Sequence, residues 1–257
     1  MNFDGLFNRT AMLVGEEGME RLRRARVAVF GLGGVGSYVA ETLARLPVGH
    51  LLLVDRDTVQ PSNLNRQLPA TVDTLGLPKA AVVAERLKSV NPELDIDARN
   101  EELRVMNIDS FLDGAGYDYV VDAVDMVVSK VALLAYCYRQ KIPLVSSMGA
   151  ARRLDPARVK VADIAKTRDC PLARDVRKRL RKLGIHKGIT VVYSDEEPLL
   201  PSGVKALEEG GAPDGRGPIS GSISYMPAMF GVHCAAVVVR GLLDGMEFPA
   251  RGKTSKQ

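Results

Sequence analysis

RVAVFGLGGVGSYVAETLARL, residues 26–46, decides the fold of this chain. Its first five residues form an apolar run that predicts a strand, and the later apolar residues recur at helical spacing. Between them, Gly31, Gly33, Gly34 and Gly36 fit the pattern G-x-G-x-x-G. Small residues at such a turn let backbone N–H groups and the helix N-terminus approach a phosphate. The stretch predicts a nucleotide-binding strand–turn–helix unit, the alternative being a glycine-rich turn without a ligand.

The same alternation continues along the chain. Further strands are predicted at 50–55, 94–98, 117–121, 143–147, 159–164 and 189–193, and helices at 78–90, 127–140, 171–183 and 226–239. Near-continuous apolar strands alternating with helices are typical of a mostly parallel sheet covered on both faces. We therefore predict an α/β fold: a doubly wound, Rossmann-like, mostly parallel sheet with an elaborated C-terminal half.

We expect one domain over residues 1–257, with a nucleotide-binding half at 1–150 and a C-terminal half at 151–257. A loop at 194–222 contains six Gly and four Pro, and its length suggests a functional or mobile segment. The apolar stretch 226–239 is shorter than the roughly 20 residues that span a bilayer. It is predicted to be a buried core helix, with a membrane segment as the alternative.

Composition bounds the class of protein. The 257 residues are 46% hydrophobic and 26% charged, which excludes disorder, and the net charge of +4 would favour a polyanionic partner without proving one. The N-terminal residues lack the apolar core of a signal peptide. Three distant cysteines give neither a disulfide framework nor a C-x-x-C zinc motif. A cytoplasmic protein is expected.

The residues that follow the second strand indicate which nucleotide is bound. Asp55 stands 19 residues after Gly36, where an acidic side chain can accept hydrogen bonds from ribose hydroxyls. Asn63, Arg66 and Lys79 follow it. Such residues would neutralise β- and γ-phosphate charge and orient a leaving pyrophosphate. Hydride transfer explains none of them, so the sequence favours ATP over a dinucleotide.

Two carboxylates follow the strand at 117–121. Asp122 and Asp125 would lie at the carboxyl edge of the sheet, where open α/β sheets bind ligands. One carboxylate with several waters is an ordinary way to hold Mg²⁺ on a nucleotide. The alternative for either residue is an N-cap of the helix at 127–140.

Together, GLGGVGS, LLLVDRD, SNLNRQ, Lys79 and VVDAVD resemble the ubiquitin-activating-enzyme-like superfamily of adenylating enzymes. The resemblance implies an obligatory homodimer that binds ATP and Mg²⁺. It implies these roles: Asp55 at the ribose, Asn63, Arg66 and Lys79 at the phosphates, Asp125 on Mg²⁺, and Arg9 as an arginine finger in the partner subunit's site.

Three departures narrow the choice within that superfamily. The two C-x-x-C pairs of the sulfur-carrier activators are missing, so no structural zinc is expected and that activity is less favoured. No cysteine stands in an obvious thioester position. Cys137 and Cys234 lie on apolar faces, which predicts simple burial. Cys170 lies beside basic residues that could stabilise a thiolate, so a functional role stays an alternative there. Met126 replaces the Asn that often follows the metal-binding Asp.

The second half resembles the family of tRNA threonylcarbamoyladenosine dehydratases, most specifically at LDPARVKVADIAKT, residues 154–167. That family uses ATP to cyclise the threonylcarbamoyl side chain of an adenosine beside the tRNA anticodon, through an acyl-adenylate, releasing AMP and pyrophosphate. The attack is intramolecular, so no enzyme thiol is needed. The resemblance implies tRNA carrying the linear modification as the substrate.

Other functions remain alternatives. One is adenylation of the C-terminal glycine of a small ubiquitin-like or sulfur-carrier protein, with a sulfur-relay protein as a possible partner. A nucleotide-binding scaffold and a dehydrogenase are less favoured, because neither explains the set of phosphate-binding residues.

A basic segment lies within the second half. Its cations are Arg174, Arg177, Lys178, Arg179, Arg181, Lys182 and Lys187. We expect contacts with tRNA phosphates. The alternative is a solvated helix face with Val176, Leu180 and Leu183 turned inward.

Overall fold

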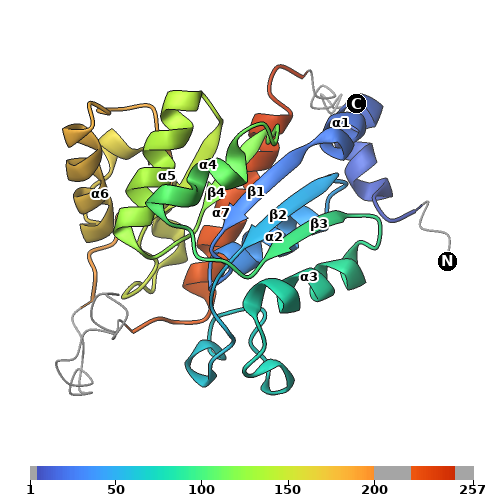
Figure 1. Ribbon diagram of the computed structural model, residues 1–257, viewed down its shortest axis with the longest axis horizontal. Helices are drawn as coiled ribbons and strands as arrows, with labels where there is room; N and C mark the ends of the chain where they lie inside the picture. Colours follow the sequence, from blue (N-terminus) through green and yellow to red (C-terminus); the bar gives the residue numbers. More distant parts are fainter. Residues whose placement is uncertain (1–4, 200–220, 247–257) are drawn as a thin grey trace, which may run out of the picture.

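The computed structural model describes residues 5–199 and 221–246, and its centre is a seven-stranded sheet (Figure 1). The strands are β1 Arg26–Phe30, β2 His50–Val54, β3 Asp95–Arg99, β4 Tyr119–Asp122, β5 Leu144–Ser147, β6 Val159–Asp163 and β7 Thr190–Ser194. Their order is β3-β2-β1-β4-β5-β7-β6, and every pair is parallel except β6 with β7. The predicted mostly parallel sheet is confirmed, with the antiparallel strand at one edge.

Helices cover both faces of this sheet. One layer contains α2 Gly36–Ala44, α3 Lys79–Val90 and α7 Tyr225–Leu242, and the other contains α4 Ile108–Leu112, α5 Val127–Gln140 and α6 Pro171–Lys182. Short 3₁₀ turns lie at Pro61–Asn63, Val72–Thr74, Val105–Asn107, Pro156–Arg158 and Ile164–Lys166. Two large apolar clusters, one on each face, form the core. The arrangement is the doubly wound fold that the sequence predicts.

Helix α7 is the buried core helix expected at the C-terminal apolar stretch. Within the described part of the chain it alone is long and apolar enough to cross a membrane. However, Phe230 and Cys234 are fully buried in the cluster beneath it, and Gly231 packs so closely on α2 that an added Cβ would lie 2.6 Å from the Val35 carbonyl oxygen. One face of α7, which includes Phe230 and Cys234, therefore forms part of the core.

The N-terminal helix α1, Asn8–Arg24, is absent from the sequence prediction. Gly15 interrupts it with a φ of 68°, so the helical spacing of its apolar residues breaks midway. Val14, Met19 and Leu22 pack against Leu243 just after α7. Its last residues lead directly into β1, so α1 lies at the amino edge of the sheet (Figure 1).

Candidate nucleotide-binding site

The glycine loop between β1 and α2 is closely packed. Gly31 has a φ of +86°, and an added Cβ would lie 2.6 Å from the carbonyl oxygen of Ala123. A Cβ on Gly36 would lie 1.7 Å from the Gly31 oxygen, and one on Gly34 would lie 2.9 Å from Pro227 of α7. The nearest neighbour of a Cβ on Gly33 is the Gln67 side chain at 3.6 Å. Three glycines therefore allow tight packing, while Gly33 leaves room for a ligand beside the backbone.

Asp55 ties the end of β2 to this loop. Its carboxylate accepts hydrogen bonds from the backbone N–H of Leu32 at 2.6 Å and of Asp57 at 2.8 Å. Burial raises the pKa of the Asp55 carboxyl group, and the nearby Lys79 cation opposes this rise. A carboxylate offers about four lone-pair positions, so acceptor capacity remains for the ribose hydroxyls that the sequence assigns to Asp55.

The predicted phosphate-binding residues follow β2. Lys79 begins α3, is buried, and its Nζ lies 3.0 Å from Asp57 Oδ2. Asn63 is also buried, and its Oδ1 accepts a hydrogen bond from the Gln60 N–H at 3.0 Å.

Arg66 lies against the glycine loop. A Cβ on Gly34 would be 3.3 Å from its backbone oxygen. The Nη1 atom of Arg66 donates to the Ser62 oxygen at 2.8 Å and to Asn65 Oδ1 at 2.9 Å, and partial burial lowers the pKa of the guanidinium. The structure thus brings Asp55, Arg66 and Lys79 around one loop.

The two aspartates after β4 have different surroundings. Asp122 is fully buried and forms an ion pair with Lys130 at 2.6 Å, whereas Asp125 is exposed in the loop that follows. The alternative of an N-cap is wrong for both, because α5 begins after Met126 without a side-chain cap. The loop containing Asp125 reaches the glycine loop, since Ala123 contacts Gly31.

The donor set fits a nucleotide-bound Mg²⁺. Asp125 is a single exposed carboxylate at the edge of the sheet, and residues 5–199 and 221–246 contain no group of three or more His, Cys, Asp or Glu placed to hold a metal. Mg²⁺ commonly takes one or two protein carboxylates and completes its shell with phosphates and water.

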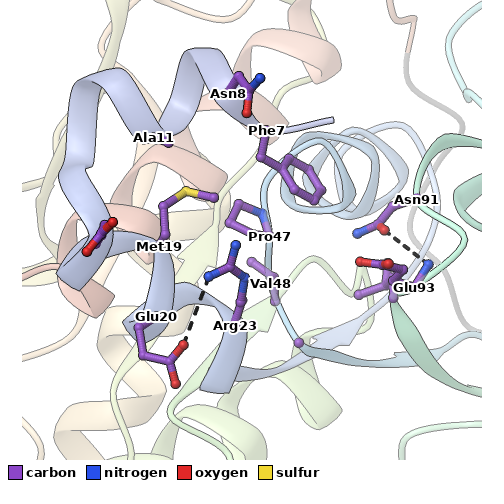
Figure 2. Close-up of a pocket in the computed structure, with 13 residues that line it drawn as sticks. Phe7, Asn8, Ala11, Met19, Glu20, Arg23, Pro47, Val48, Asn91 and Glu93 are labelled. Carbon is purple, nitrogen blue, oxygen red and sulfur yellow. Dashed lines mark hydrogen bonds and ion pairs between the residues drawn. The ribbon is translucent and has the colours of Figure 1, made fainter. Parts of the chain in front are cut away.

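Arg9 lies far from this site within one chain. It is exposed on the first turn of α1, whose residues Asn8 and Ala11 line a cavity of about 820 Å³ together with Gly49 and Asn91 (Figure 2). Gly49 precedes β2, so this cavity lies at the amino edge of the sheet, and the glycine loop lies at the carboxyl edge. Arg9 and the glycine loop of one chain therefore lie at opposite edges of the sheet.

The basic segment separates into two groups of cations. Arg177 turns back onto the fold, where Nη1 donates to the carbonyl oxygens of Ile164 and Thr167, each at 3.1 Å. Arg179 pairs with Asp175 at 3.1 Å. Arg179 is nevertheless exposed to solvent, as are Arg174, Lys178, Arg181, Lys182 and Lys187.

The inward face of α6 differs in part from the prediction. Ala173, Val176 and Leu180 are buried, but Leu183 is 44% exposed, so its predicted inward position is wrong. Leu183 follows the last helical residue, where the chain leaves α6. It lines a groove of about 430 Å³ between α5 and α6 together with Val128, Lys178 and Lys182.

The three cysteines are all buried. Burial raises the pKa of the Cys137 thiol to about 12 and also raises that of Cys234, so neither is a thiolate at neutral pH. Cys170, for which the sequence left a functional role as an alternative, is only 5% exposed. These environments are those of packing residues.

Two residues near the site were missed in the sequence. Asp57, which pairs with Lys79, stands two positions after Asp55, and this D-x-D spacing was the available signal. Lys130 had no signal, because a lysine in the helical pattern at 127–140 is expected on a solvated face.

A model of the ThiF family matches residues 7–255. The chain belongs to the ThiF family. It is 46% identical to the tRNA threonylcarbamoyladenosine dehydratase of Bacillus subtilis over 194 residues, which cover 76% of each chain. It is 41% identical to the Escherichia coli enzyme of the same name, over 79% of this chain and 81% of that one.

Solved structures of ThiF-family relatives agree with this assignment. The crystal structure of E. coli tRNA N6-threonylcarbamoyladenosine dehydratase in complex with ATP superposes with a TM-score of 0.83 at 36% identity, over 92% of this chain and 93% of that one. The complex of that enzyme with AMP gives 0.84. The molybdopterin-synthase adenylyltransferase of Salmonella typhimurium matches less of this chain, 58% at 40% identity. The predicted resemblance and fold class are confirmed.

Proposed function

We propose that this chain is an ATP-dependent tRNA threonylcarbamoyladenosine dehydratase. The observation that carries the proposal is the match, over most of both chains, to a dehydratase whose structure holds ATP. The glycine loop of this chain lies at the carboxyl edge of the same fold, with Asp55, Arg66 and Lys79 around it.

The chemistry begins with a carboxylate that is a poor electrophile, because its leaving group would be oxide. A carboxylate oxygen of the threonylcarbamoyl group attacks the α-phosphorus of ATP, and pyrophosphate leaves. The carbamoyl group of the same side chain then attacks the acyl carbon and loses a proton. AMP leaves with the former carboxylate oxygen, so the tRNA loses one water. Both reacting groups belong to one molecule, which favours cyclisation without an enzyme thiol.

The residues of the site suit the first of these steps. Asp55 would accept hydrogen bonds from the ribose, and Asn63, Arg66 and Lys79 would stabilise charge on the phosphates as pyrophosphate leaves. Asp125 would hold Mg²⁺, which when bound supplies charge neutralisation at the same phosphates. The ion pair of buried Lys79 with partly exposed Asp57 would keep the ammonium group at the start of α3 before ATP binds.

A homodimer would complete the site. Arg9 lies at the amino edge of its own sheet, so its proposed contact with ATP phosphates requires the site of a second subunit. Exposed apolar side chains on the same helix, Met12 at 81% and Leu13 at 69%, are suited to burial against that subunit.

The tRNA substrate would contact the exposed cations of α6. The groove between α5 and α6 begins at Val128, three residues after Asp125, so this surface adjoins the proposed reaction centre. Such a substrate accords with a cytoplasmic enzyme. Arg177 would support the helix and not the RNA, because its guanidinium binds backbone oxygens.

A second candidate is adenylation of the C-terminal glycine of a carrier protein, favoured by the 40% identity to the adenylyltransferase from S. typhimurium. A sulfur-relay partner belongs with that candidate. Exchange of labelled pyrophosphate into ATP distinguishes the two. We expect tRNA with the linear modification to stimulate exchange and a carrier protein to have no effect; stimulation by the carrier alone would overturn the proposal.

A further inference from the structure

A buried lysine links three elements beneath the loop that contains Asp125. Lys130 lies in the first turn of α5 and is fully buried. Its Nζ donates to Asp122 Oδ2 at 2.6 Å, to the Ser147 carbonyl oxygen at 3.0 Å and to Ser146 Oγ at 3.4 Å. Ser146 Oγ in turn donates to Asp122 Oδ2 at 2.5 Å. The ends of β4 and β5 and the start of α5 are thereby joined at one ammonium group.

The other oxygen of Asp122 shapes the loop itself. Oδ1 accepts a hydrogen bond from the Val124 N–H at 3.2 Å, so the buried carboxylate holds the turn at 123–125 from below. The Ala123 N–H donates to the Phe30 oxygen at 2.8 Å, and Ala123 also contacts Gly31. Asp125 is therefore the last residue of a turn that is held on one side by Asp122 and on the other by the glycine loop.

Stability alone is a weak reason for such an arrangement. Removing two charges from water is costly, and buried ion pairs are often replaceable by apolar side chains without loss of stability. An apolar pair could not, however, donate and accept the hydrogen bonds by which Lys130 and Asp122 hold the turn. Groups that orient a metal ligand from outside the coordination shell commonly change metal affinity or activity 10- to 100-fold when they are mutated.

We propose that Lys130 and Asp122 are positioning residues that hold the 123–125 turn so that the Asp125 carboxylate meets the Mg²⁺ on bound ATP. The inference rests on the proposed function, which assigns Mg²⁺ to Asp125. Neither residue touches the nucleotide; each acts through the backbone of the turn.

The test is the affinity for ATP with and without Mg²⁺, measured by isothermal titration calorimetry on the full-length protein. Lys130→Met keeps the length of the side chain and removes the ammonium group. We expect the factor by which Mg²⁺ strengthens ATP binding to fall by about 10- to 100-fold. The affinity for ATP without Mg²⁺ should change little, because it depends on the glycine loop, Asp55 and Arg66.

Leu134→Ala is the matched control, because Leu134 is fully buried in the same helix and its truncation destabilises the protein without touching the pair. It should lower the Tm and keep the Mg²⁺ effect. If Lys130→Met does not fold, Ser146→Ala removes one hydrogen bond to Asp122 without leaving a charge unpaired, and it should reduce the Mg²⁺ effect in the same direction.

The outcomes distinguish a failure of the positioning role from a failure of the assignment of Mg²⁺ to Asp125. A full Mg²⁺ effect in Lys130→Met, or in Ser146→Ala where that variant is needed, would overturn the positioning role, as would equal losses of affinity with and without Mg²⁺. If Mg²⁺ fails to strengthen ATP binding in the wild-type protein, the assignment of the metal to Asp125 is itself contradicted, whatever the variants do.

Discussion

Three exposed cations of α6 should set much of the salt dependence of tRNA binding. Lys178, Arg181 and Lys182 are exposed, and none of them forms an ion pair with the described residues. Changing all three to Ala removes them without disturbing the buried face of the helix, formed by Ala173 and Leu180. The expected result is weaker binding that depends less steeply on salt, because fewer counterions are released from the RNA.

The size of the effect follows from the number of contacts. Each phosphate contact contributes about −0.7 to −0.9 to the slope of log affinity against log salt concentration. Three lost contacts should therefore reduce the slope by about 2 to 3. The ratio of wild-type to variant affinity should then shrink roughly 20- to 40-fold between about 50 and about 200 mM salt.

The assay is filter binding of tRNA over that salt range. The control is the triple variant Arg24→Ala, Arg45→Ala and Arg139→Ala, whose residues lie at the ends of α1, α2 and α5, at the amino edge of the sheet. Both triple variants lower the formal net charge from +4 to +1, because each removes three cations. If both reduce the slope equally, α6 is no specific contact surface and only net charge matters.

Three further predictions test the site. Gly36→Ala should abolish ATP binding in a fluorescence titration, since its Cβ would lie 1.7 Å from a backbone oxygen. The control Gly33→Ala should keep a Tm within about 2 °C of wild type. Unimpaired ATP binding by Gly36→Ala would contradict the packing described. Arg177→Ala should lower the free energy of unfolding by about 2–3 kcal/mol in urea, because two partly buried carbonyl oxygens lose a charged donor. A loss below about 0.5 kcal/mol would argue against its structural role. The third prediction mixes inactive Arg9→Ala subunits with inactive Lys79→Ala subunits and lets them reassemble. About one quarter of wild-type activity should return, because half of the dimers contain one subunit of each kind and each such dimer has one complete site. No return of activity would exclude action of Arg9 in the partner's site.

The nucleotide-binding half was readable from the sequence because its signals are local. The run at 26–46 contains a strand, a turn and a helix whose glycines each meet a nearby backbone or side chain, and β1 and α2 appear where the pattern predicts them. Asp55 was likewise predictable, because an acidic residue at the end of the second strand is part of the same motif.

Features that depend on distant partners could not be read in this way. Lys130 is interpretable only when β4 and β5 are side by side, since its hydrogen bonds reach Asp122, Ser146 and Ser147. Arg177 was grouped with the other cations because composition does not show that its guanidinium turns toward the carbonyl of Ile164.

Helix α1 was missed for a related reason. The positive φ of Gly15 breaks the helical period, and the packing partner of α1 after α7 lies more than 200 residues away in the sequence. Part of the predicted loop at 194–222 lies outside the described residues.

The most direct measurement is the mass of one nucleoside. The purified protein is incubated with ATP, Mg²⁺ and tRNA that bears linear threonylcarbamoyladenosine, and the RNA is digested and analysed by mass spectrometry. A product lighter than the starting nucleoside by one water, formed only with ATP and accompanied by equal amounts of AMP, is expected. An unchanged nucleoside, from a protein that binds ATP and tRNA normally, would contradict the proposed dehydration.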